Sequence, residues 1–514
     1  MLAIINSCAF LGVTGYLVKV EVDVGAGLPA FDIVGLPDTT VRESRERVRA
    51  AIKNSGYEFP LRRITVNLAP ADIKKEGAIF DLPIAIAILA ATEQIINVEG
   101  KLKTAAIVGE LSLDGAVRPV SGALVMSDCL GRTEGVKHFY LPVANAMEAA
   151  IIDEVDVFGV SSLRGLCEVL EETEQIPPVK VDIAELLRAE GTSDTYDMSD
   201  VKGQEGVKRA LEIAAAGGHN ILLIGPPGSG KTMLARRLPG ILPPMTLEES
   251  LEVTKLYSIS GLLPKTTPLV KSRPFRSPHH GASSASIIGG GATPKPGEIS
   301  LASQGVLFMD EMPEFNRDVL EALRQPLEDR TVIVSRVRGR VEYPAGFQLV
   351  GALNPCPCGY YGDMQKQCSC TPHMIDRYLN RISGPLMDRV DLQIEVPRVK
   401  YSDLSDRRDG DSSRIIRLRV IAAREVQKKR FEGTSVNCNA QMGHREVQSY
   451  CLLDKEGDAL MKMAFGKLHL SARAHDRILK VARTIADLDS SADITASHIA
   501  EAIQYRNMDR KPQQ

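Results

Sequence analysis

The chain has 514 residues, and its 62 Lys and Arg against 65 Asp and Glu give a formal net charge of -3 at pH 7. This balance excludes a surface that is basic throughout, although local basic patches remain compatible with it. The longest apolar run, Ile84–Ala91, is far shorter than the ~18 residues needed to cross a bilayer, so no membrane partner is expected. Nine cysteines are too few for a disulfide framework and favour reduced thiols in a cytoplasmic protein. No Lys or Arg precedes Lys19, so no signal peptide is expected.

Shifts in composition divide the chain, whose length predicts roughly three domains. Residues 1–170 carry alternating strand patterns and short helices, and residues 171–199 are predicted to be a linker because they contain Pro177-Pro178 and an acidic tract. Residues 200–397 alternate between strand, loop and helix patterns, as in an α/β domain. Residues 398–514 begin with a charged break and then have helical spacing.

The N-terminal segment contains one clear strand and one clear helix. Val18–Val24 alternates apolar and charged residues strictly, as a half-buried strand does. Thr40 followed by Glu43 predicts a capping box that opens a helix extending to about Asn54.

The most informative segment is a glycine-rich loop between an apolar strand, residues 220–224, and a helical run from Met233. The loop fits the pattern G-x-x-x-x-G-K-[ST], in which successive backbone N–H groups point at phosphate oxygens. The residues predicted to bind the nucleotide are Gly225, Pro226, Pro227, Gly228, Ser229, Gly230, Lys231 and Thr232. Lys231 is expected to reach the β and γ phosphates of ATP, and the Thr232 hydroxyl to bind Mg²⁺.

A second apolar strand, residues 305–309, ends in Asp310 and Glu311, about 80 residues after the loop. Asp310 is expected to hold Mg²⁺ through water, and Glu311 to orient and deprotonate the attacking water. A solvated strand end is the alternative. Together the two motifs predict an ATPase.

Three later residues extend a resemblance to AAA+ ATPases. Asn354 ends the apolar strand 347–353 and resembles the sensor-1 residue, which contacts the γ-phosphate or the lytic water. Arg389, in the segment 384–391, resembles the arginine finger of the magnesium-chelatase and MCM-helicase branch, with a surface ion pair as its alternative. Arg473 resembles the sensor-2 arginine of a helical lid, although a helical Arg more often belongs to a solvated face.

Two insertions match the pore-facing loops of the helicase-like AAA+ proteins. One is a glycine-rich loop over residues 277–291, which contains the adjacent His279 and His280; these are a poor metal pair, and a loop role is expected for them. The other, residues 329–346, is predicted to be a β-hairpin with its turn near Arg338. Arg336, Arg338 and Arg340 are expected to share one face of a strand and to track a DNA backbone. The alternative is a solvated edge strand protected by charge.

A basic helix over residues 414–430 either flanks the DNA path or is a solvated face.

Four of the nine cysteines form the pattern C-x-C-x₉-C-x-C: Cys356, Cys358, Cys368 and Cys370. Four thiolates are the ligand set of a structural Zn²⁺, which is the favoured interpretation. The one-residue spacing is tighter than in most zinc knuckles, and reduced thiols or reversible disulfides are the alternatives.

Residues 108–120 resemble the segment of Lon proteases that precedes their catalytic lysine. Leu124 stands where that lysine belongs, and residues 77–83 replace the turn that carries the catalytic serine. Because Lon proteolysis needs both members of the Ser–Lys dyad, none is expected here. Ser112 and Ser121 are not at the motif position, and the domain is expected to serve as scaffold or contact surface.

The order of a Lon-like domain, a magnesium-chelatase-type AAA+ module and a helical domain resembles the ComM/YifB family. The resemblance implies an α/β fold, with an AAA+ P-loop NTPase core, an N-terminal Lon-like α+β domain and a C-terminal helical lid domain. It also implies a homo-hexameric, ATP-driven DNA motor that assembles with nucleotide or DNA and acts on single-stranded or branched DNA, as in branch migration during integration of transforming DNA. The alternatives are a chelatase-type or protein-remodelling ATPase that acts on a protein partner.

Overall fold

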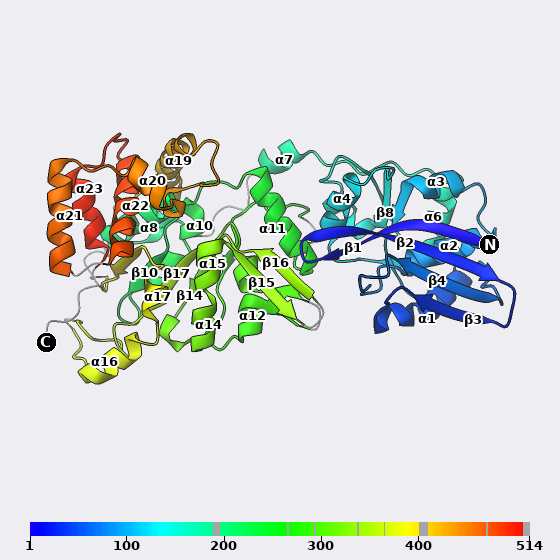
Figure 1. Cartoon of the computed structure of the whole chain (residues 1–514), viewed down its shortest axis with the longest axis horizontal. Coiled ribbons are helices and arrows are strands. Elements are labelled where there is room, and N and C mark those ends of the chain that lie inside the picture. The colour runs from blue at the N-terminus through cyan, green and yellow to red at the C-terminus, as the bar shows by residue number, and fades with distance from the viewer. Residues whose placement is uncertain are drawn as a thin grey trace. The chain divides into compact units, whose positions relative to one another are not determined.

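The computed structural model describes residues 1–188, 196–264, 267–291, 294–336, 339–363, 365–399, 410–468 and 471–506. Two compact units are present (Figure 1). Unit 1 is Met1–Ala189 with Leu247–Val270, and unit 2 is Glu190–Thr246 with Lys271–Gln514. In the part of the chain that is described, no helix is both long and apolar enough to cross a membrane.

Unit 1 is built on a mixed seven-stranded sheet with the order β3-β4-β2-β1-β5-β8-β9. Strand β2 pairs antiparallel with both β1 and β4. The other neighbouring pairs, β3 with β4, β1 with β5, β5 with β8 and β8 with β9, are parallel. The strands are β1 (Leu2–Leu11), β2 (Thr14–Gly25), β3 (Ala30–Val34), β4 (Arg63–Ala69), β5 (Ala105–Ile107), β8 (His138–Pro142) and β9 (Asp156–Val160), with a small separate ladder of β6 (Glu110–Leu111) and β7 (Val117–Arg118). The predicted strand 18–24 is confirmed within β2.

The helices of unit 1 cover both faces of this sheet. They are α1 (Thr39–Asn54), α2 (Asp81–Ala91), α3 (Glu99–Thr104), α4 (Ala123–Gly131), α5 (Val143–Ala149), α6 (Leu163–Leu170), α7 (Ile183–Arg188) and α11 (Leu247–Ile259). Alternation along β1 sends Ile5 and Ala9 into a core with α1 and α2, and Cys8 into a core with α4 and α5. Helix α7 lies within the stretch expected to be a linker.

The predicted helix over residues 40–54 is confirmed as α1, but the predicted capping box is wrong. The helix begins one residue earlier, at Thr39, and Asp38 is its N-cap. The Asp38 carboxylate accepts a hydrogen bond from the backbone N–H of Val41 at 2.7 Å. Because the Asp38 carboxylate already caps the first turn, Thr40 lies inside the helix and is not its N-cap.

Unit 2 contains a five-stranded parallel sheet with the order β11-β14-β17-β10-β18. Its strands are β10 (Ile221–Ile224), β11 (Phe275–Arg276), β14 (Val306–Met309), β17 (Gln348–Leu353) and β18 (Leu392–Glu395). All side chains of β10, β14 and β17 are buried, as expected for a parallel sheet covered on both faces. Two small ladders accompany it: β12 (Gly289–Gly290) with β13 (Lys295–Pro296), and β15 (Thr331–Arg336) with β16 (Gly339–Pro344).

Helices surround the sheet of unit 2 and continue beyond its last strand. Those up to β18 are η1 (Met198–Asp200), α8 (Glu205–Gly217), α9 (Lys231–Ala235), α10 (Leu238–Ile241), α12 (Ser284–Ile288), α13 (Glu298–Leu301), η2 (Met312–Glu314), α14 (Arg317–Ala322), α15 (Arg324–Asp329), α16 (Pro372–Leu379) and α17 (Gly384–Met387). After β18 follow α19 (Ser413–Arg430), η3 (Asn439–Gln441), α20 (His444–Tyr450), α21 (Lys455–Leu468), α22 (Ala472–Leu488) and α23 (Ala496–Gln504). The expected helical C-terminal segment is thus confirmed, and its apolar side chains share one core with α8.

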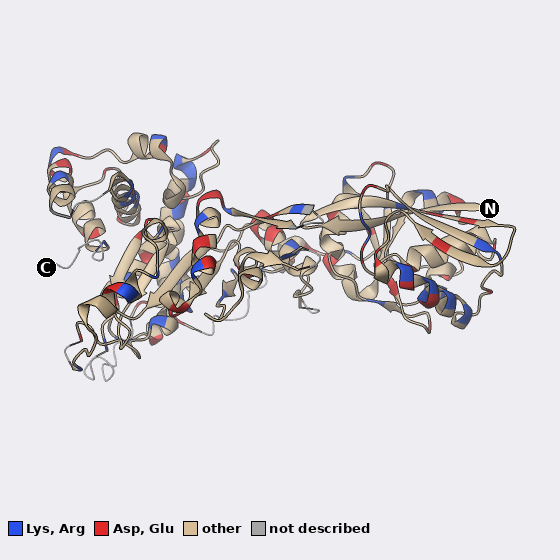
Figure 2. Cartoon of the chain, turned by 60° about the horizontal axis from the view of Figure 1, so that its bottom comes forward, with Lys and Arg blue, Asp and Glu red and all other residues tan. Residues whose placement is uncertain are grey.

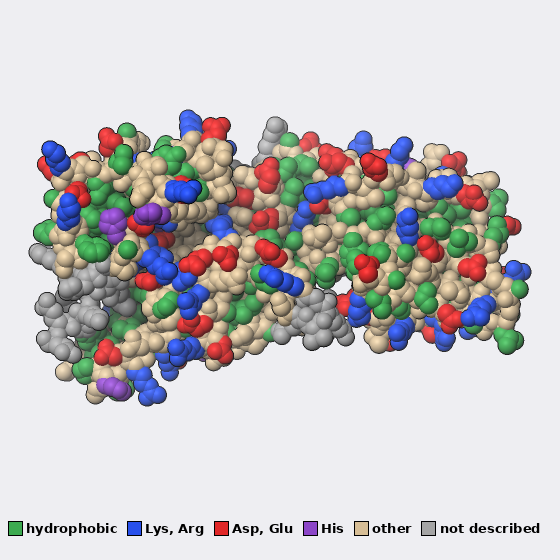
Figure 3. All heavy atoms as spheres, viewed as in Figure 1, with side chains coloured by type: hydrophobic (Ala, Val, Ile, Leu, Met, Phe, Trp, Pro, Cys, Tyr) green, Lys and Arg blue, Asp and Glu red, His purple; other side chains and the backbone are tan. Residues whose placement is uncertain are grey.

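Charges of both signs are distributed over the ribbons of both units in Figure 2. On the face drawn in Figure 3, basic, acidic and apolar side chains are interspersed. The mixed α/β fold with a parallel-sheet nucleotide-type core, predicted from the sequence, is confirmed.

Candidate functional site

The candidate site lies at the carboxyl-end edge of the parallel sheet in unit 2. Strands β14, β17 and β10 are neighbours and run in the same direction, so the loops that follow them emerge at one edge. The connection after β10 leads past β17 and β14 to the edge strand β11, whereas the connections after β11, β14 and β17 lead in the opposite direction across the sheet. Open α/β sheets bind their ligands in the crevice that such a reversal creates.

The glycine-rich loop 225–232, the candidate phosphate loop, follows β10, and glycine is required at two of its positions. Gly230 has a φ of +89°, a backbone conformation that side chains with a Cβ rarely adopt. A Cβ on Gly225 would lie 2.3 Å from the carbonyl oxygen of Val396, so the two backbones approach too closely for any larger residue. The loop geometry therefore depends directly on the motif glycines.

Lys231 begins α9 and folds back over this loop. Its Nζ donates hydrogen bonds to two loop carbonyls, the nearer being that of Gly225 at 2.7 Å, and to Oδ1 of Asn354 at 3.1 Å. Burial lowers the pKa of Lys231, an effect that the negative charges of Asp310 and Glu311 oppose. Among the described residues, all of its hydrogen-bond partners are neutral, and a buried cation with no carboxylate among these partners favours a bound anion. The residues present therefore fit a phosphate group.

Thr232 and Asp310 bring two hard oxygen ligands together. The Thr232 hydroxyl donates a hydrogen bond to Oδ2 of Asp310 at 2.7 Å, across 78 residues of sequence. Mg²⁺ in nucleotide sites is held by one or two such oxygens and by the phosphates. When bound, the ion would neutralise charge on the phosphates, and Thr232 and Asp310 are the groups that fit it.

Glu311 follows Asp310 in a strained conformation. Its φ is +50°, which is uncommon for any residue except glycine and is typical of functional sites. Its Oε2 lies 3.5 Å from Nδ1 of His280, a residue in the loop after β11. The ring of His280 lies 4.1 Å from that of His279, tilted by 34°, and makes a T-shaped contact with Phe315. His280 is therefore a neighbour of the carboxylate that was expected to activate water.

The two candidate arginines have different surroundings. Arg389 is 9% exposed, and its guanidinium pairs with Glu328 at 2.5 Å and donates to the carbonyl of Pro385. The side chain of Arg473 is 66% exposed and lies 3.9 Å from Asp388. Within the described residues, neither arginine makes a hydrogen bond or ion pair with the phosphate loop.

The predicted hairpin is confirmed as β15 and β16, but the expectation of one shared arginine face is wrong. Arg336 ends β15 and pairs with Gly339, while Arg340 lies in β16 opposite Ser335. The two arginines belong to different strands, so alternation along a single strand does not relate them. Arg340 is exposed, whereas Arg338 lies outside the described residues.

The basic helix, confirmed as α19, uses several of its cations inside the chain. Arg417 and Arg424 donate to backbone carbonyls of Gly240 and Ala215, and Arg430 pairs with Asp487. Arg419 pairs with Glu212. These contacts fix the helix to the rest of unit 2, which the charge count of the helix does not reveal.

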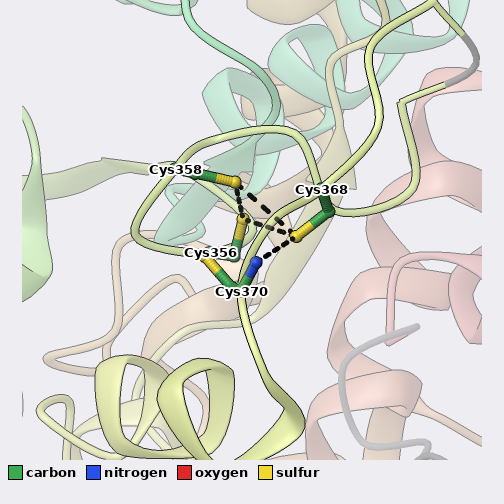
Figure 4. A group of neighbouring side chains, drawn as sticks. All are labelled: Cys356, Cys358, Cys368 and Cys370. Atoms are coloured by element: carbon green, nitrogen blue, oxygen red, sulfur yellow. Dashed lines mark hydrogen bonds between the residues drawn. The ribbon is translucent and has the colours of Figure 1, made fainter.

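The four clustered cysteines meet in the connection between β17 and α16 (Figure 4). Their sulfur atoms all lie within 4.8 Å of one another, with Cys356 buried and the other three half-buried. All nine cysteines of the chain are free thiols. The cluster is a ligand set that could hold a metal ion.

In unit 1, the positions that correspond to the Lon dyad have other surroundings. Leu124 is fully buried in α4. Asp81 lies at the start of α2, within the segment that replaces the serine turn, and pairs with Arg47 at 2.6 Å. The Ser44 hydroxyl also donates to the Asp81 carboxylate. The residue at this turn is thus committed to a buried ion pair.

Sequence patterns did not predict three contacts that candidate site residues make in the structure. His280 contacts Glu311, Glu328 pairs with Arg389, and Gly359 packs against the phosphate loop. None of these contacts has a local signal, because each joins segments that are distant in sequence.

Three family models match consecutive parts of the chain. "Subunit ChlI of Mg-chelatase" matches residues 20–145, "Magnesium chelatase, subunit ChlI" residues 197–404, and "Magnesium chelatase, subunit ChlI C-terminal" residues 410–506.

Full-length relatives agree with these matches. The chain is 46% identical to the uncharacterized protein YifB of Salmonella typhimurium over 511 residues, covering 99% of this chain and 98% of the relative. It is 44% identical to the competence protein ComM of Haemophilus influenzae over 512 residues, again covering 99% and 98%. A weaker similarity, 29% over 187 residues, covers 31% of this chain and 32% of Lon protease 2 of Bacillus subtilis. With a nucleotide-type site in a parallel sheet and near-complete coverage of these relatives, the chain belongs to the ComM/YifB family of magnesium-chelatase-like AAA+ proteins.

Proposed function

We propose that this protein hydrolyses ATP with Mg²⁺ and uses the energy to move along DNA. The main observation in favour of ATP hydrolysis is that three separate segments of the chain contact one another. Lys231 reaches Asn354, and Thr232 reaches Asp310, so a lysine, an amide and two Mg²⁺-type oxygens surround one loop.

Each of these groups has a role in phosphoryl transfer. Lys231 and the loop amides bind the phosphates, and Thr232 and Asp310 hold Mg²⁺. Glu311 takes the proton of the attacking water, with Asn354 positioned near the terminal phosphate. Arg389 neutralises charge that develops in the transition state, from a neighbouring subunit of a homo-hexameric ring, and Arg473 is assigned the same role over the same nucleotide.

The DNA assignment rests on the hairpin and on the name of a relative. Arg340 is exposed in β16, and Arg336 ends β15. A relative that matches the full chain is named a competence protein, which supports action on incoming single-stranded or branched DNA during natural transformation. Helicase activity or branch migration would be the outcome.

We also propose domain boundaries, a cellular location and a structural metal site. The three matched family segments support a division into residues 1–170, a linker 171–199, an ATPase domain 200–397 and a helical domain 398–514. The free thiols support a cytoplasmic location, and the sulfur geometry supports a structural Zn²⁺ at the four clustered cysteines.

The decisive experiment measures ATP hydrolysis by the full chain with and without single-stranded or forked DNA. We expect DNA to stimulate hydrolysis, and the triple change Arg336→Ala, Arg338→Ala, Arg340→Ala to remove the stimulation while leaving the basal rate. A matched control changes three exposed basic residues of α1 to Ala: Arg42, Arg45 and Lys53. The control should respond to DNA like the wild type.

Two outcomes would contradict the proposal. A basal ATPase that every DNA structure leaves unchanged would favour a chelatase-type or protein-remodelling motor. Equal loss of stimulation in the α1 control would show that the hairpin has no specific part in it.

A further inference from the structure

The four sulfur atoms of the cysteine cluster all lie within 4.8 Å of one another, and three of them have the spacing of ligands in a tetrahedral metal site. The Sγ atoms of Cys356 and Cys358 are 3.3 Å apart, those of Cys356 and Cys368 3.7 Å, and those of Cys358 and Cys368 3.6 Å. Zinc bound to four thiolates at about 2.3 Å places the sulfurs about 3.8 Å apart. A disulfide needs about 2.05 Å, so the arrangement is that of separate ligands (Figure 4).

Backbone amides support the same sulfurs. The N–H of Tyr361 donates to Sγ of Cys356 at 3.3 Å, and the N–H of Cys370 donates to Sγ of Cys368 at 3.4 Å. Such hydrogen bonds orient metal ligands and stabilise their charged form. An all-sulfur tetrahedral set selects zinc over Mg²⁺, which prefers oxygen.

The cluster lies in a long connection that has little else to order it. Between the end of β17 at Leu353 and the start of α16 at Pro372, the described residues form no helix or strand. Connections longer than roughly 12 residues without such structure are uncommon in compact domains. A metal that joins both ends of this connection would give it one conformation.

The same connection packs against the phosphate loop. Asn354, two residues before Cys356, accepts the hydrogen bond from Lys231. Gly359, one residue after Cys358, has a φ of +84°, and a Cβ there would lie 2.5 Å from Cδ of Pro227 in the phosphate loop. The first cysteine pair is therefore bracketed by two contacts with the nucleotide site.

We propose that Zn²⁺ bound by Cys356, Cys358, Cys368 and Cys370 braces the phosphate loop, so that zinc and nucleotide stabilise each other's binding. This inference rests on the proposed nucleotide site. Zinc holds residues 354–359 in place, and these residues hold Pro227 and Lys231. Coupling between two such sites is reciprocal, because each ligand favours the same loop conformation.

The first test measures zinc and nucleotide binding on the purified full chain. Wild type should contain about one zinc per chain by elemental analysis, and less than about 0.3 would overturn the inference. Cys358→Ser and Cys370→Ser, both at half-buried positions, should lose zinc and bind a fluorescent ATP analogue between about 5-fold and 150-fold more weakly. Cys129→Ser, a half-buried cysteine of unit 1, should change neither quantity.

Zinc removal from the wild type avoids dependence on variants that fold poorly. A chelator selective for zinc over Mg²⁺ should weaken binding of the analogue, and added zinc should restore it. ATP with Mg²⁺ should in turn slow zinc release. Unchanged nucleotide affinity after complete zinc removal would overturn the brace.

Gly359→Ala separates the brace from the metal. The new methyl group would press on Pro227, so nucleotide affinity should fall while the zinc content stays at the wild-type value. Unchanged nucleotide affinity would show that the contact between Gly359 and Pro227 does not couple the zinc site to the nucleotide site. Wild type that holds zinc but binds no nucleotide would instead refute the proposed ATPase, which keeps the two failures distinguishable.

Discussion

Glu311 is held on two sides, by its own strained backbone and by His280. Its φ of +50° is a strained backbone conformation, and the His280 ring lies 3.5 Å from one carboxylate oxygen. A group that activates water must be oriented to within fractions of an ångström. His280 is therefore expected to be a positioning residue for Glu311.

We expect His280→Ala to lower kcat by up to about 100-fold while KM for ATP changes little, because misplacing a reacting group costs rate rather than affinity. His280→Gln, which retains a hydrogen-bonding group, should recover part of the loss. Steady-state ATPase assays check this, with Glu311→Gln, expected to bind ATP but not hydrolyse it, as the lower limit. His373→Ala, an exposed histidine on α16, is the control. A fall in affinity with unchanged kcat would contradict the positioning role.

At the scale of elements, Asp391 joins the C-terminal helices to the sheet. It lies just before β18, and its carboxylate contacts Nδ1 of His219 at 3.2 Å and Nη1 of Arg477 on α22 at 3.1 Å. It also accepts the backbone N–H of Asn220, just before β10. One buried carboxylate thus ties the ends of α8 and β18 to α22.

We expect Asp391→Ala to lower the free energy of unfolding by about 3–5 kcal/mol, because it leaves buried partners unpaired. Burial alone would raise the pKa of Asp391, but the hydrogen bond with His219 and the charge of Arg477 lower it well below its usual value. A carboxyl with a lowered pKa contributes stability that is complete above its unfolded value of about 3.9 and is lost as pH falls through the folded value.

Denaturant unfolding at several pH values tests both statements. The difference between wild type and Asp391→Ala should be constant from pH 6 to 8 and should narrow below about pH 4. Asp388→Ala, which removes only a long, exposed pair with Arg473, should cost at most about 1 kcal/mol. A difference that grows on acidification would refute the assignment.

At the scale of the whole molecule, the proposed ring assigns Arg389 to the nucleotide of a neighbouring subunit. In one chain its guanidinium pairs with Glu328 at 2.5 Å and does not reach the phosphate loop among the described residues. An arginine that acts on a neighbouring subunit must exchange such a partner for the nucleotide. Supplied in this way, it typically accelerates hydrolysis by about 10³–10⁵-fold.

Mixing two inactive variants tests this arrangement. Arg389→Ala keeps a nucleotide site but lacks the arginine, and Lys231→Ala keeps the arginine but lacks a site. Each alone should be inactive, whereas mixed rings should regain activity, since some interfaces combine the intact halves. Mass measurement of the particles should show nucleotide-dependent assembly. Failure to regain activity in particles shown to contain both variants would refute action between subunits.

Local sequence patterns were sufficient to predict those features that depend on consecutive residues. The loop 225–232, the strand before Asp310 and the hairpin at 329–346 are readable because a strand, a turn and a glycine position are each encoded within a few residues. The spacing of the cysteines likewise predicted a metal-type cluster, and the structure brings all four together. The capping box at Thr40 failed because Asp38 offers a better acceptor nearby.

The sequence by itself determined the kind of sheet, the phosphate loop and the ligands around it, because β10 and its glycines specify their own backbone. Only the tertiary structure decided which distant residues meet these groups: His280 with Glu311, Glu328 with Arg389, and Gly359 with Pro227. It also decided that Arg336 and Arg340 lie on different strands, and that residues 247–270 pack into unit 1. These contacts depend on strand order and register, which arise when the whole sheet is assembled and leave no trace in any short stretch of chain.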